Sequence, residues 1–407
     1  MEKEQIQKYL ASDFTYPIRD PLWHHIYLSR PIKNICLTPA FMKLHNILQL
    51  GPTYLLYPGA THTRAAHSYG VYEVTKRIIC ELLKHQDCPP LTLAGVKGLL
   101  VAALLHDTGH FPYAHSLKEL PLKEHEAITA TLILEDPIKS IIENELEADP
   151  YFCAAIVDSK MDLQSIAPHL VGNKELSLYQ NILSGTLDPD KLDYLNRDAF
   201  FCGVPYGIQD IDFILNKIQP CGYEGISVAE SAIPSIENLL FSKYLMYKTV
   251  YWHKTVRIAT AMIKKAIVTA LTNGELLPTN LYGLTDDQFY QKCSSPTIST
   301  SHLIRQTKTG KLFSTFKEQP FDQDNKLHRD LLNLEFRVDY EKSLAKKMGL
   351  NSSDVIIDIP EPINFETTFP IKDGEKTTLF LNSHTVFSKP VVKGFQENLR
   401  IIRYLCP

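Results

Sequence analysis

Histidines are concentrated in one short part of the chain. Seven of the fifteen histidines fall within 64 residues, and six of these are the candidates for a chemical role: His62, His67, His106, His110, His115 and His125. Neutral imidazole together with carboxylate suits borderline to hard divalent ions such as Fe, Mn, Zn or Mg. The eight cysteines include no CxxC pair, which argues against a thiolate zinc site or a disulfide framework. We therefore expect one divalent metal ion held by histidine and aspartate.

The adjacent pair His106 and Asp107 stands at the end of an apolar helix. Residues 99–105 are apolar on every side, and Gly109 and Pro112 follow the pair as stop signals. A carboxylate in a core is costly unless a cation or a strong donor meets it. The pattern favours a metal, with a buried hydrogen bond between the two side chains as the alternative. A lone histidine, by contrast, is more often a satisfied core or surface residue.

Neighbouring helices must bring further groups to this pair. Apolar residues spaced by three and four, from Val71 to Leu83, predict a helix that begins near Ala65. His67 lies four residues before Val71 and should point inward with the apolar stripe. A third long helix is expected over residues 235–271. The stretch 238–274 has no acid but six bases, which makes it a candidate anion-binding wall: Lys243, Lys248, Lys254, Arg257, Lys264 and Lys265.

The 407 residues are enough for a large core and two or three domains. The pattern is helical over the first two-thirds, and residues 1–272 are interpreted as one core with an N-terminal extension. Residues 284–330 are polar and weakly periodic, which predicts a loop-rich connection. A helix over 331–348 and short β runs at 355–359, 365–371, 377–381 and 399–405 should follow. The predicted fold class is mainly α, with a smaller C-terminal α+β region over 273–407.

Net charge and hydrophobic runs limit the partners and the cellular location that we expect for the protein. A net charge of −4 predicts no general attraction to nucleic acid. The first residues are charged where a secretory signal would be apolar, and the longest aliphatic run is too short to cross a bilayer. We expect a cytoplasmic protein that does not associate with membranes.

Four ordered sequence runs resemble the HD superfamily: HTRAAHS, LLHDTGHFPYAH, KEHE and LDPDKLDYLNRD. Residues 20–265, with QLGPTYLLYPGATHTRAAHS and YLMYKTVYWHK, resemble its deoxynucleoside triphosphate (dNTP) triphosphohydrolases in particular. The resemblance implies an HD-domain helical core that hydrolyses a dNTP to a deoxynucleoside and inorganic triphosphate. It implies four metal ligands: His67, His106, Asp107 and Asp190. Spacing alone would not choose Asp190 over Asp188 or Asp193.

The same resemblance assigns the remaining site residues. His110, His115 and His125 fall at catalytic positions, with His125 as general acid and the other two orienting water and phosphate. Imidazole suits these roles because it titrates near the working pH. Phosphate contacts are implied for Arg64, Lys191 and Lys243, and sugar contacts for Gln49, Tyr194, Asp198 and Tyr251, with Leu50 and Tyr247 beside them. Lys243, Tyr247, Tyr251 and Lys254 recur at helical spacing and should share one face, although a helical tyrosine taken alone usually packs in a core.

The chain departs from the family pattern in two places. Lys118, followed by Glu119, stands where the family usually has an acid near the second catalytic histidine, so the proton relay is expected to be wired differently. Leu37, Met42 and His45 replace the residues that select a guanine activator in the vertebrate enzyme. Activation by GTP in that manner is therefore not expected. The family commonly forms dimers or tetramers, and a homo-oligomer is the implied assembly.

Two other functions compete with dNTP hydrolysis. One is another HD phosphohydrolase that acts on a monophosphate, a cyclic dinucleotide or an alarmone. The other is binding of single-stranded nucleic acid by the acid-free basic helix, with a vestigial metal site. Strong salt dependence would mark the second activity.

Overall fold

The computed structural model describes residues 2–374 and 376–407. Two of the predicted helices lie within the histidine-rich part of the chain. Helix α4 (Arg64–Leu82) begins where Thr63 accepts a hydrogen bond from the Ala66 backbone N–H. Helix α5 (Leu93–Leu105) begins in the same way at Thr92 and is buried on all sides from Gly98 onward. Side-chain caps of this kind satisfy N–H groups that the helix itself cannot bond. The two helices pack together and place His106 and Asp107 at the end of α5.

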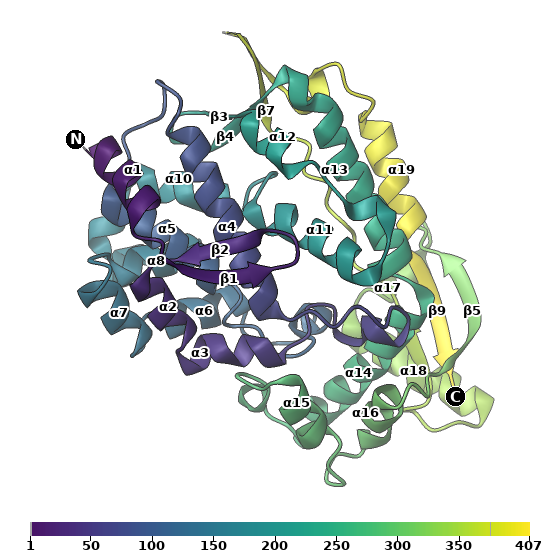
Figure 1. Ribbon diagram of the computed structural model, residues 1–407. Coiled ribbons are helices and arrows are strands. Elements are labelled where there is room, and N and C mark those ends of the chain that lie inside the picture. Colours follow the sequence, from purple (N-terminus) through teal and green to yellow (C-terminus); the bar gives the residue numbers. More distant parts are fainter. Residues whose placement is uncertain (1, 375) are drawn as a thin grey trace.

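A third helix completes the part of the core that carries the site. Helix α11 (Pro189–Cys202) is capped by Asp188, starts with proline, and stops at Gly203 in the left-handed conformation (φ 66°). It packs against α4, while α6 (His125–Ile133) packs on α8 (Pro150–Val157). The other helices of this half surround them (Figure 1): α1 (Glu2–Ser12), α2 (Arg30–Cys36), α3 (Pro39–Met42), α7 (Ile138–Asn144), α9 (Leu163–Ile166), α10 (Lys174–Leu183) and α12 (Ile211–Asn216).

The long helix predicted over residues 235–271 is interrupted. It consists of α13 (Ile233–Met246), a π-helical turn η7 (Tyr247–Tyr251) and α14 (Lys254–Thr272). The His253 side chain accepts from the Thr255 backbone N–H and so starts α14 afresh. A π turn inserts an extra residue into the helical repeat and rotates the faces on either side of it. Lys243, Tyr247, Tyr251 and Lys254 were predicted to share one helix face. That prediction is wrong for Lys254, which follows the π turn.

The predicted loop-rich connection is wrong, because residues 284–330 form regular elements. These are α15 (Asp286–Cys293), α16 (Ser301–Lys308), β5 (Ser314–Pro320) and α17 (Lys326–Asp330). Thr285 and Gln288 form a capping box that starts α15. Each of the first two helices is eight residues long and buries only a few apolar side chains, such as Phe289 and Leu303. Two turns of helix give too short a pattern for periodicity to reveal.

Three small sheets among the described residues complete the fold. The hairpin β1 (Tyr16–Asp20) and β2 (His24–Leu28) was not predicted. The second sheet has the order β3 (Ile218–Pro220), β4 (Ile226–Ala229), β7 (Pro370–Asp373), β8 (Lys376–Leu379), with β4 and β7 parallel. The third places β9 (Ile401–Cys406) between β5 and β6 (Ile356–Asp358). Helix α18 (Leu334–Met348) matches its prediction, whereas α19 (Lys389–Leu399) was missed.

The C-terminal region contributes side chains to two apolar clusters of the helical core. Phe365, Phe369 and Phe380 join the main apolar cluster, and Leu405 joins a second one built around α14. Figure 1 shows α19 running along α13, where the Tyr244 and Phe395 rings stack with centroids 4.3 Å apart. The predicted class, mainly α with a C-terminal α+β region, is confirmed, while the domain boundary at residue 272 stays a prediction. Within the described ranges, no helix is both long and apolar enough to cross a membrane.

Candidate active site

The four predicted metal ligands converge from three helices. His67, His106 and Asp107 each place one donor atom within 4.8 Å of the others. Asp190 Oδ1 lies 2.8 Å from His67 Nε2 and 4.0 Å from His106 Nε2. Metal–ligand bonds of about 2.1 Å require donor atoms at comparable separations around the ion. The geometry is therefore compatible with one divalent ion among these side chains, although the ligand roles stay a prediction.

The donor atoms themselves fit a cation. His106 Nδ1 donates to the Ala103 carbonyl (2.9 Å), so the lone pair of the ring is on Nε2. That Nε2 atom is buried and has no hydrogen-bond partner among the described residues. Because a buried acceptor without a partner is costly, an ion at this point would relieve a defect in the protein. Two imidazoles and two carboxylates suit Fe, Mn or Zn better than a soft ion.

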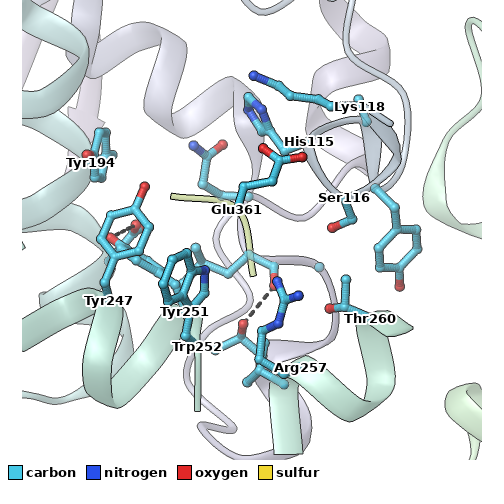
Figure 2. A pocket seen from close by; sticks show the side chains of 18 of the residues that line it. His115, Ser116, Lys118, Tyr194, Tyr247, Tyr251, Trp252, Arg257, Thr260 and Glu361 are labelled. Carbon is cyan, nitrogen blue, oxygen red and sulfur yellow. Dashed lines mark hydrogen bonds between the residues drawn. The ribbon is translucent and has the colours of Figure 1, made fainter. Parts of the chain in front are cut away.

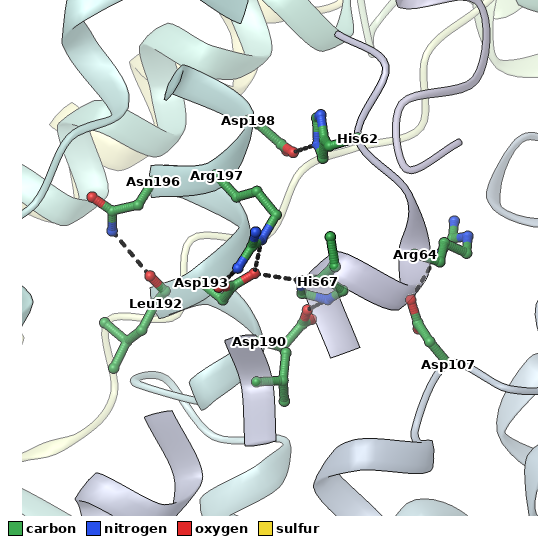
Figure 3. A network of polar contacts seen from close by, with 12 residues as sticks. His62, Arg64, His67, Asp107, Asp190, Leu192, Asp193, Asn196, Arg197 and Asp198 are labelled. Atoms are coloured by element: carbon green, nitrogen blue, oxygen red, sulfur yellow. Dashed lines mark hydrogen bonds and ion pairs between the residues drawn. The ribbon is translucent and has the colours of Figure 1, made fainter. Parts of the chain in front are cut away.

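A polar network behind His67 fixes how that ring points (Figure 3). His67 Nδ1 lies 2.8 Å from Asp193 Oδ2, and Arg197 donates to both oxygens of the same carboxylate at 2.8 Å. Trp23 Nε1 also donates to Asp193 (2.5 Å), and Arg197 reaches Asp20 (2.8 Å). Burial opposes ionisation of Asp193, but Arg197 and His67 hold its pKa well below the usual range. An ionised Asp193 accepts from Nδ1 and so turns Nε2 toward the proposed ion.

The pKa values of His67 and Asp190 reflect their direct contact. Burial disfavours a charged His67, but hydrogen bonds to Asp190 and Asp193 outweigh it and raise its pKa to about 10. Burial likewise opposes ionisation of Asp190, yet His67 lowers its pKa to about 2. Without an ion, a proton on His67 Nε2 therefore bridges the pair. A divalent cation would replace that proton between the same two atoms.

The close approach of α11 to α4 depends on Gly70. A Cβ atom at this position would lie 1.8 Å from Asp193 Oδ1 and 2.5 Å from Arg197 Nη2. We expect Gly70→Ala to lower the free energy of unfolding by about 1–3 kcal/mol, since buried groups must shift. Denaturant titration measures the loss. Gly394→Ala, where a Cβ has nothing within 4 Å, is the matched control; equal stabilities for the two variants would contradict this packing.

The three histidines predicted to be catalytic form one cluster. His110 Nε2 lies 3.0 Å from His115 Nε2, and the His110 and His125 rings have centroids 3.7 Å apart. The approach of α6 requires Gly109, because a Cβ there would lie 2.1 Å from the His125 carbonyl oxygen. His110 Nδ1 lies 3.1 Å from Asp107 Oδ1, so the cluster borders the metal ligands. Proton transfer and metal binding could thus act on one reacting group.

Burial favours the neutral form of these histidines. Burial, helped by the charge of Arg64, holds the pKa of His110 well below its usual range. Burial and the neighbouring His115 lower the pKa of His125 to about 2. An anionic phosphate beside His125 would favour its protonated form, as a general acid requires. Glu119 is not available to this cluster, because it pairs with Lys264 (2.6 Å) and with Arg337.

All predicted site residues except His110 line one cavity of about 660 Å³. Figure 2 shows Tyr194, Tyr247 and Tyr251 on one side of it and His115 with Lys118 on the other. Asp198 accepts from the Tyr251 hydroxyl (2.6 Å) and contacts His62 Nε2 (2.7 Å). Gln49 and Leu50 are held beside α4 by the bridge between Leu48 and Thr63. The cavity is large enough for a nucleotide and combines aromatic with charged walls.

The three bases that are predicted to contact phosphate each pair with an acid of the protein. Arg64 Nη1 donates to Asp107 Oδ2 (2.7 Å). Lys191 pairs with Asp188 (2.5 Å), and Lys243 pairs with Glu366 (3.1 Å). Each of these bases is mostly buried and faces the cavity. An anion at these bases therefore competes with carboxylates of the protein.

The predicted anion-binding wall is not a free basic surface. Five of its six bases pair with acids that are distant in sequence: Lys243 with Glu366, Lys254 with Glu318, Arg257 with Asp358, Lys264 with Glu119 and Lys265 with Glu341. Lys254 does not line the cavity. Four of the five acids belong to the C-terminal region, so the tail neutralises the helix that it covers. The linear charge pattern is therefore a poor guide to the folded surface.

Two residues with supporting roles were missed by sequence reasoning. Asp193 orients His67, and His62 holds Asp198 while stacking on Phe201 with ring centroids 4.6 Å apart. Asp193 lies three residues after Asp190 and so recurs on the same helix face, which is a weak local signal. His62 belonged to the dense histidine group but carried no local sign of its partner.

Comparisons with known proteins agree with this geometry. The model of the HD domain matches residues 64–182, and the model of an HD-associated region matches residues 210–387. The Bacillus subtilis protein YwfO is 32% identical over 251 residues, covering 61% of this chain and 54% of its own. The chicken (Gallus gallus) deoxynucleoside triphosphate triphosphohydrolase SAMHD1 is 26% identical over 280 residues, covering 63% and 45%. The chain thus spans about half the length of these curated relatives.

Solved structures share the fold over nearly the whole chain. A protein of Aquifex aeolicus has a TM-score of 0.72 and 24% identity, with 96% of both chains covered. A phosphohydrolase of Bacteroides thetaiotaomicron also has a TM-score of 0.72, at 20% identity, with 96% and 99% covered. These likenesses show the fold, while the matched models show that the chain carries an HD domain over residues 64–182 and an HD-associated region over residues 210–387, and the similarity to SAMHD1 shows that it resembles the dNTP triphosphohydrolases of the HD superfamily.

Proposed function

We propose that the protein is a metal-dependent phosphohydrolase that converts a dNTP to a deoxynucleoside and inorganic triphosphate. The observation that carries this proposal is the convergence on one cavity of about 660 Å³. A metal-ligand set, imidazoles, lysines and a tyrosine wall all face it. The similarity to SAMHD1 supports the choice of substrate.

The residues can be assigned to the steps of this hydrolysis. His67, His106, Asp107 and Asp190 would hold the ion, which when bound polarises a phosphoryl oxygen and lowers the pKa of water. Arg64 would bind oxygens of the α-phosphate, and His110 and His115 would orient the water that attacks the α-phosphorus. The bond from that phosphorus to the 5′ oxygen breaks, and His125 delivers a proton to the departing oxygen. Lys191 and Lys243 would then neutralise the triphosphate product.

The tyrosine wall supports a deoxynucleotide rather than a ribonucleotide. Tyr251 is fixed by its hydrogen bond to Asp198 (2.6 Å) and by edge contacts to Tyr194 and Tyr247. A rigid ring beside the sugar would leave no room for a 2′-hydroxyl. Gln49 has a buried Oε1 with no partner among the described residues and could take a donor from the sugar.

We expect purified protein to release inorganic triphosphate from at least one dNTP when Mn²⁺, Fe²⁺, Zn²⁺ or Mg²⁺ is supplied. Ion-exchange separation of the phosphate products and chromatography of the nucleoside measure the reaction. The matching ribonucleotide should be cleaved at least about tenfold more slowly, because its additional 2′-hydroxyl would clash with the ring of Tyr251. Release of monophosphate, or of nothing across all four metals, would contradict the dNTP assignment. A screen of monophosphates, cyclic dinucleotides and alarmones would then identify another HD phosphohydrolase activity.

The resemblance also supports a homo-oligomer, either a dimer or a tetramer. Phe200, Ile208 and Phe241 are 51%, 60% and 45% exposed, and apolar side chains of this size suit contact with a second copy. Weak binding of single strands is less well supported, since five of the six bases on the α13–α14 segment are paired. A cytoplasmic location stays a prediction.

A further inference from the structure

The Glu366 carboxylate lies between two of the lysines that line the cavity, Lys191 and Lys243. Lys243 Nζ donates to Glu366 Oε2 (3.1 Å) and to the Asn364 carbonyl (2.8 Å). Lys191 Nζ lies 3.6 Å from Glu366 Oε1. The lysine side chains are only 8% and 13% exposed, whereas Glu366 is 32% exposed. These two cations of the cavity wall are therefore already bridged by a carboxylate of the protein.

Glu366 reaches this place from a segment that crosses the cavity. Residues 359–366 follow β6, precede β7 and form no regular element. Ile359, Glu361, Pro362, Ile363, Asn364 and Glu366 all line the cavity, and Figure 2 shows Glu361 projecting into it. A segment without ladder hydrogen bonds can move at lower cost than a strand or helix. The lysines, by contrast, are fixed on helices α11 and α13.

Glu366 presents negatively charged oxygens to the two lysines, as a ligand phosphate would. Burial opposes its ionisation, but Lys243 and Lys191 outweigh it and lower the pKa of the carboxyl. Two oxygens with a shared negative charge thus stand between two ammonium groups. A phosphate presents the same arrangement with more charge. An anion that binds both lysines therefore competes with this carboxylate.

We propose that Glu366 is a specificity-determining residue that occupies the position of a distal phosphate and must be displaced by the polyphosphate chain of the ligand. The inference rests on the proposed function in taking Lys191 and Lys243 as the phosphate site. An intramolecular carboxylate competes at a high effective concentration. A ligand also held at Arg64 and the metal centre competes on equal terms, because its distal phosphates are delivered from within the cavity. Short anions with no second anchor are disfavoured.

The test compares Glu366→Gln with Glu318→Gln. Glu318 is an acid of the same C-terminal region that pairs with Lys254 (3.1 Å) of the same helical segment, outside the cavity. Titration calorimetry with inorganic triphosphate should show about tenfold tighter binding for the Glu366 variant, because the competing charge is gone. The gain should shrink as salt is added. The Glu318 variant should bind as the unmodified protein does.

A second measurement uses the unmodified protein. Hydrogen exchange of the amides in residues 361–366 should speed up when inorganic triphosphate is bound, because Glu366 no longer ties the segment to Lys191 and Lys243. Unchanged exchange there, or an equally stable Glu366→Gln variant that binds no more tightly, would overturn the inference. Should that variant be less stable, the exchange experiment decides. Neither readout needs turnover, so a protein that releases Glu366 but cleaves no dNTP would sink the proposed function alone.

Discussion

Replacing Asp107 by asparagine should remove the bound metal and reduce nucleotide hydrolysis on the order of a thousandfold. Asp107 supplies one of the donor atoms grouped within 4.8 Å and also holds Arg64 at 2.7 Å. A bound metal contributes several kcal/mol to the transition state, and about 4 kcal/mol corresponds to a factor of a thousand. Elemental analysis of the purified variant and its steady-state rate measure the two losses.

Asp212→Asn provides the matched control. Asp212 pairs with Arg77, but its side chain is 81% exposed and lies outside the cavity. It should keep both metal and activity. An Asp107→Asn protein that retains stoichiometric metal would contradict the ligand assignment. Any binding of single-stranded nucleic acid should survive the substitution, because it would depend on basic side chains rather than on the ion.

Local patterns were sufficient to predict the helices that carry the histidines. The apolar spacing from Val71 onward and the uniformly apolar run before His106 each identify a helix and its inward face. The contact between His67 and Asp190 is different, because the two residues are 123 positions apart and meet only when α11 packs on α4. Spacing left three aspartates open at that point. Only the ordered motifs of the HD superfamily selected one of them.

The C-terminal region was predicted less well because its role depends on long-range pairing. Arg257 meets Asp358 at 2.5 Å, and Lys265 meets Glu341 at 2.5 Å, although each pair is separated by more than seventy residues. An acid-free run of sequence says nothing about acids that arrive from elsewhere in the fold. The π turn at Tyr247 was also hidden, because the residues around it recur in the sequence at the spacing of an α-helix. Only the structure shows that the turn rotates the helix faces on either side of it.

Supporting residues were the part of the site that sequence reasoning could not reach. Asp193 lies within the run LDPDKLDYLNRD, one turn after Asp190, but nothing in that run marks it as the partner of His67. Its function follows from two facts of packing: it is fully buried, and it receives Nδ1 of His67 at 2.8 Å. A carboxylate behind a ligand histidine fixes the tautomer and the direction of the ring. That role makes a quantitative prediction.

Asp193→Asn should lower metal affinity about 10–100-fold, the usual cost of removing a group that orients a ligand histidine. The amide cannot accept from His67, Arg197 and Trp23 together, and it adds donors where Asp193 offered only acceptors. Leaving Arg197 with one of its two partners should also cost about 3–5 kcal/mol of unfolding free energy. Competition with a chelator of known affinity measures the first effect, and denaturant titration measures the second.

The two effects are separated by Asp20→Asn. Asp20 binds the same Arg197 side chain at 2.8 Å and caps the turn at Leu22 and Trp23, but it makes no contact with His67. This variant should lose stability while its metal affinity stays near that of the unmodified protein. If both variants weaken metal binding equally, the effect comes from general destabilisation and Asp193 has no orienting role. A selective loss in Asp193→Asn means that the direction of one imidazole ring, set by a carboxylate behind it, controls the affinity of the site.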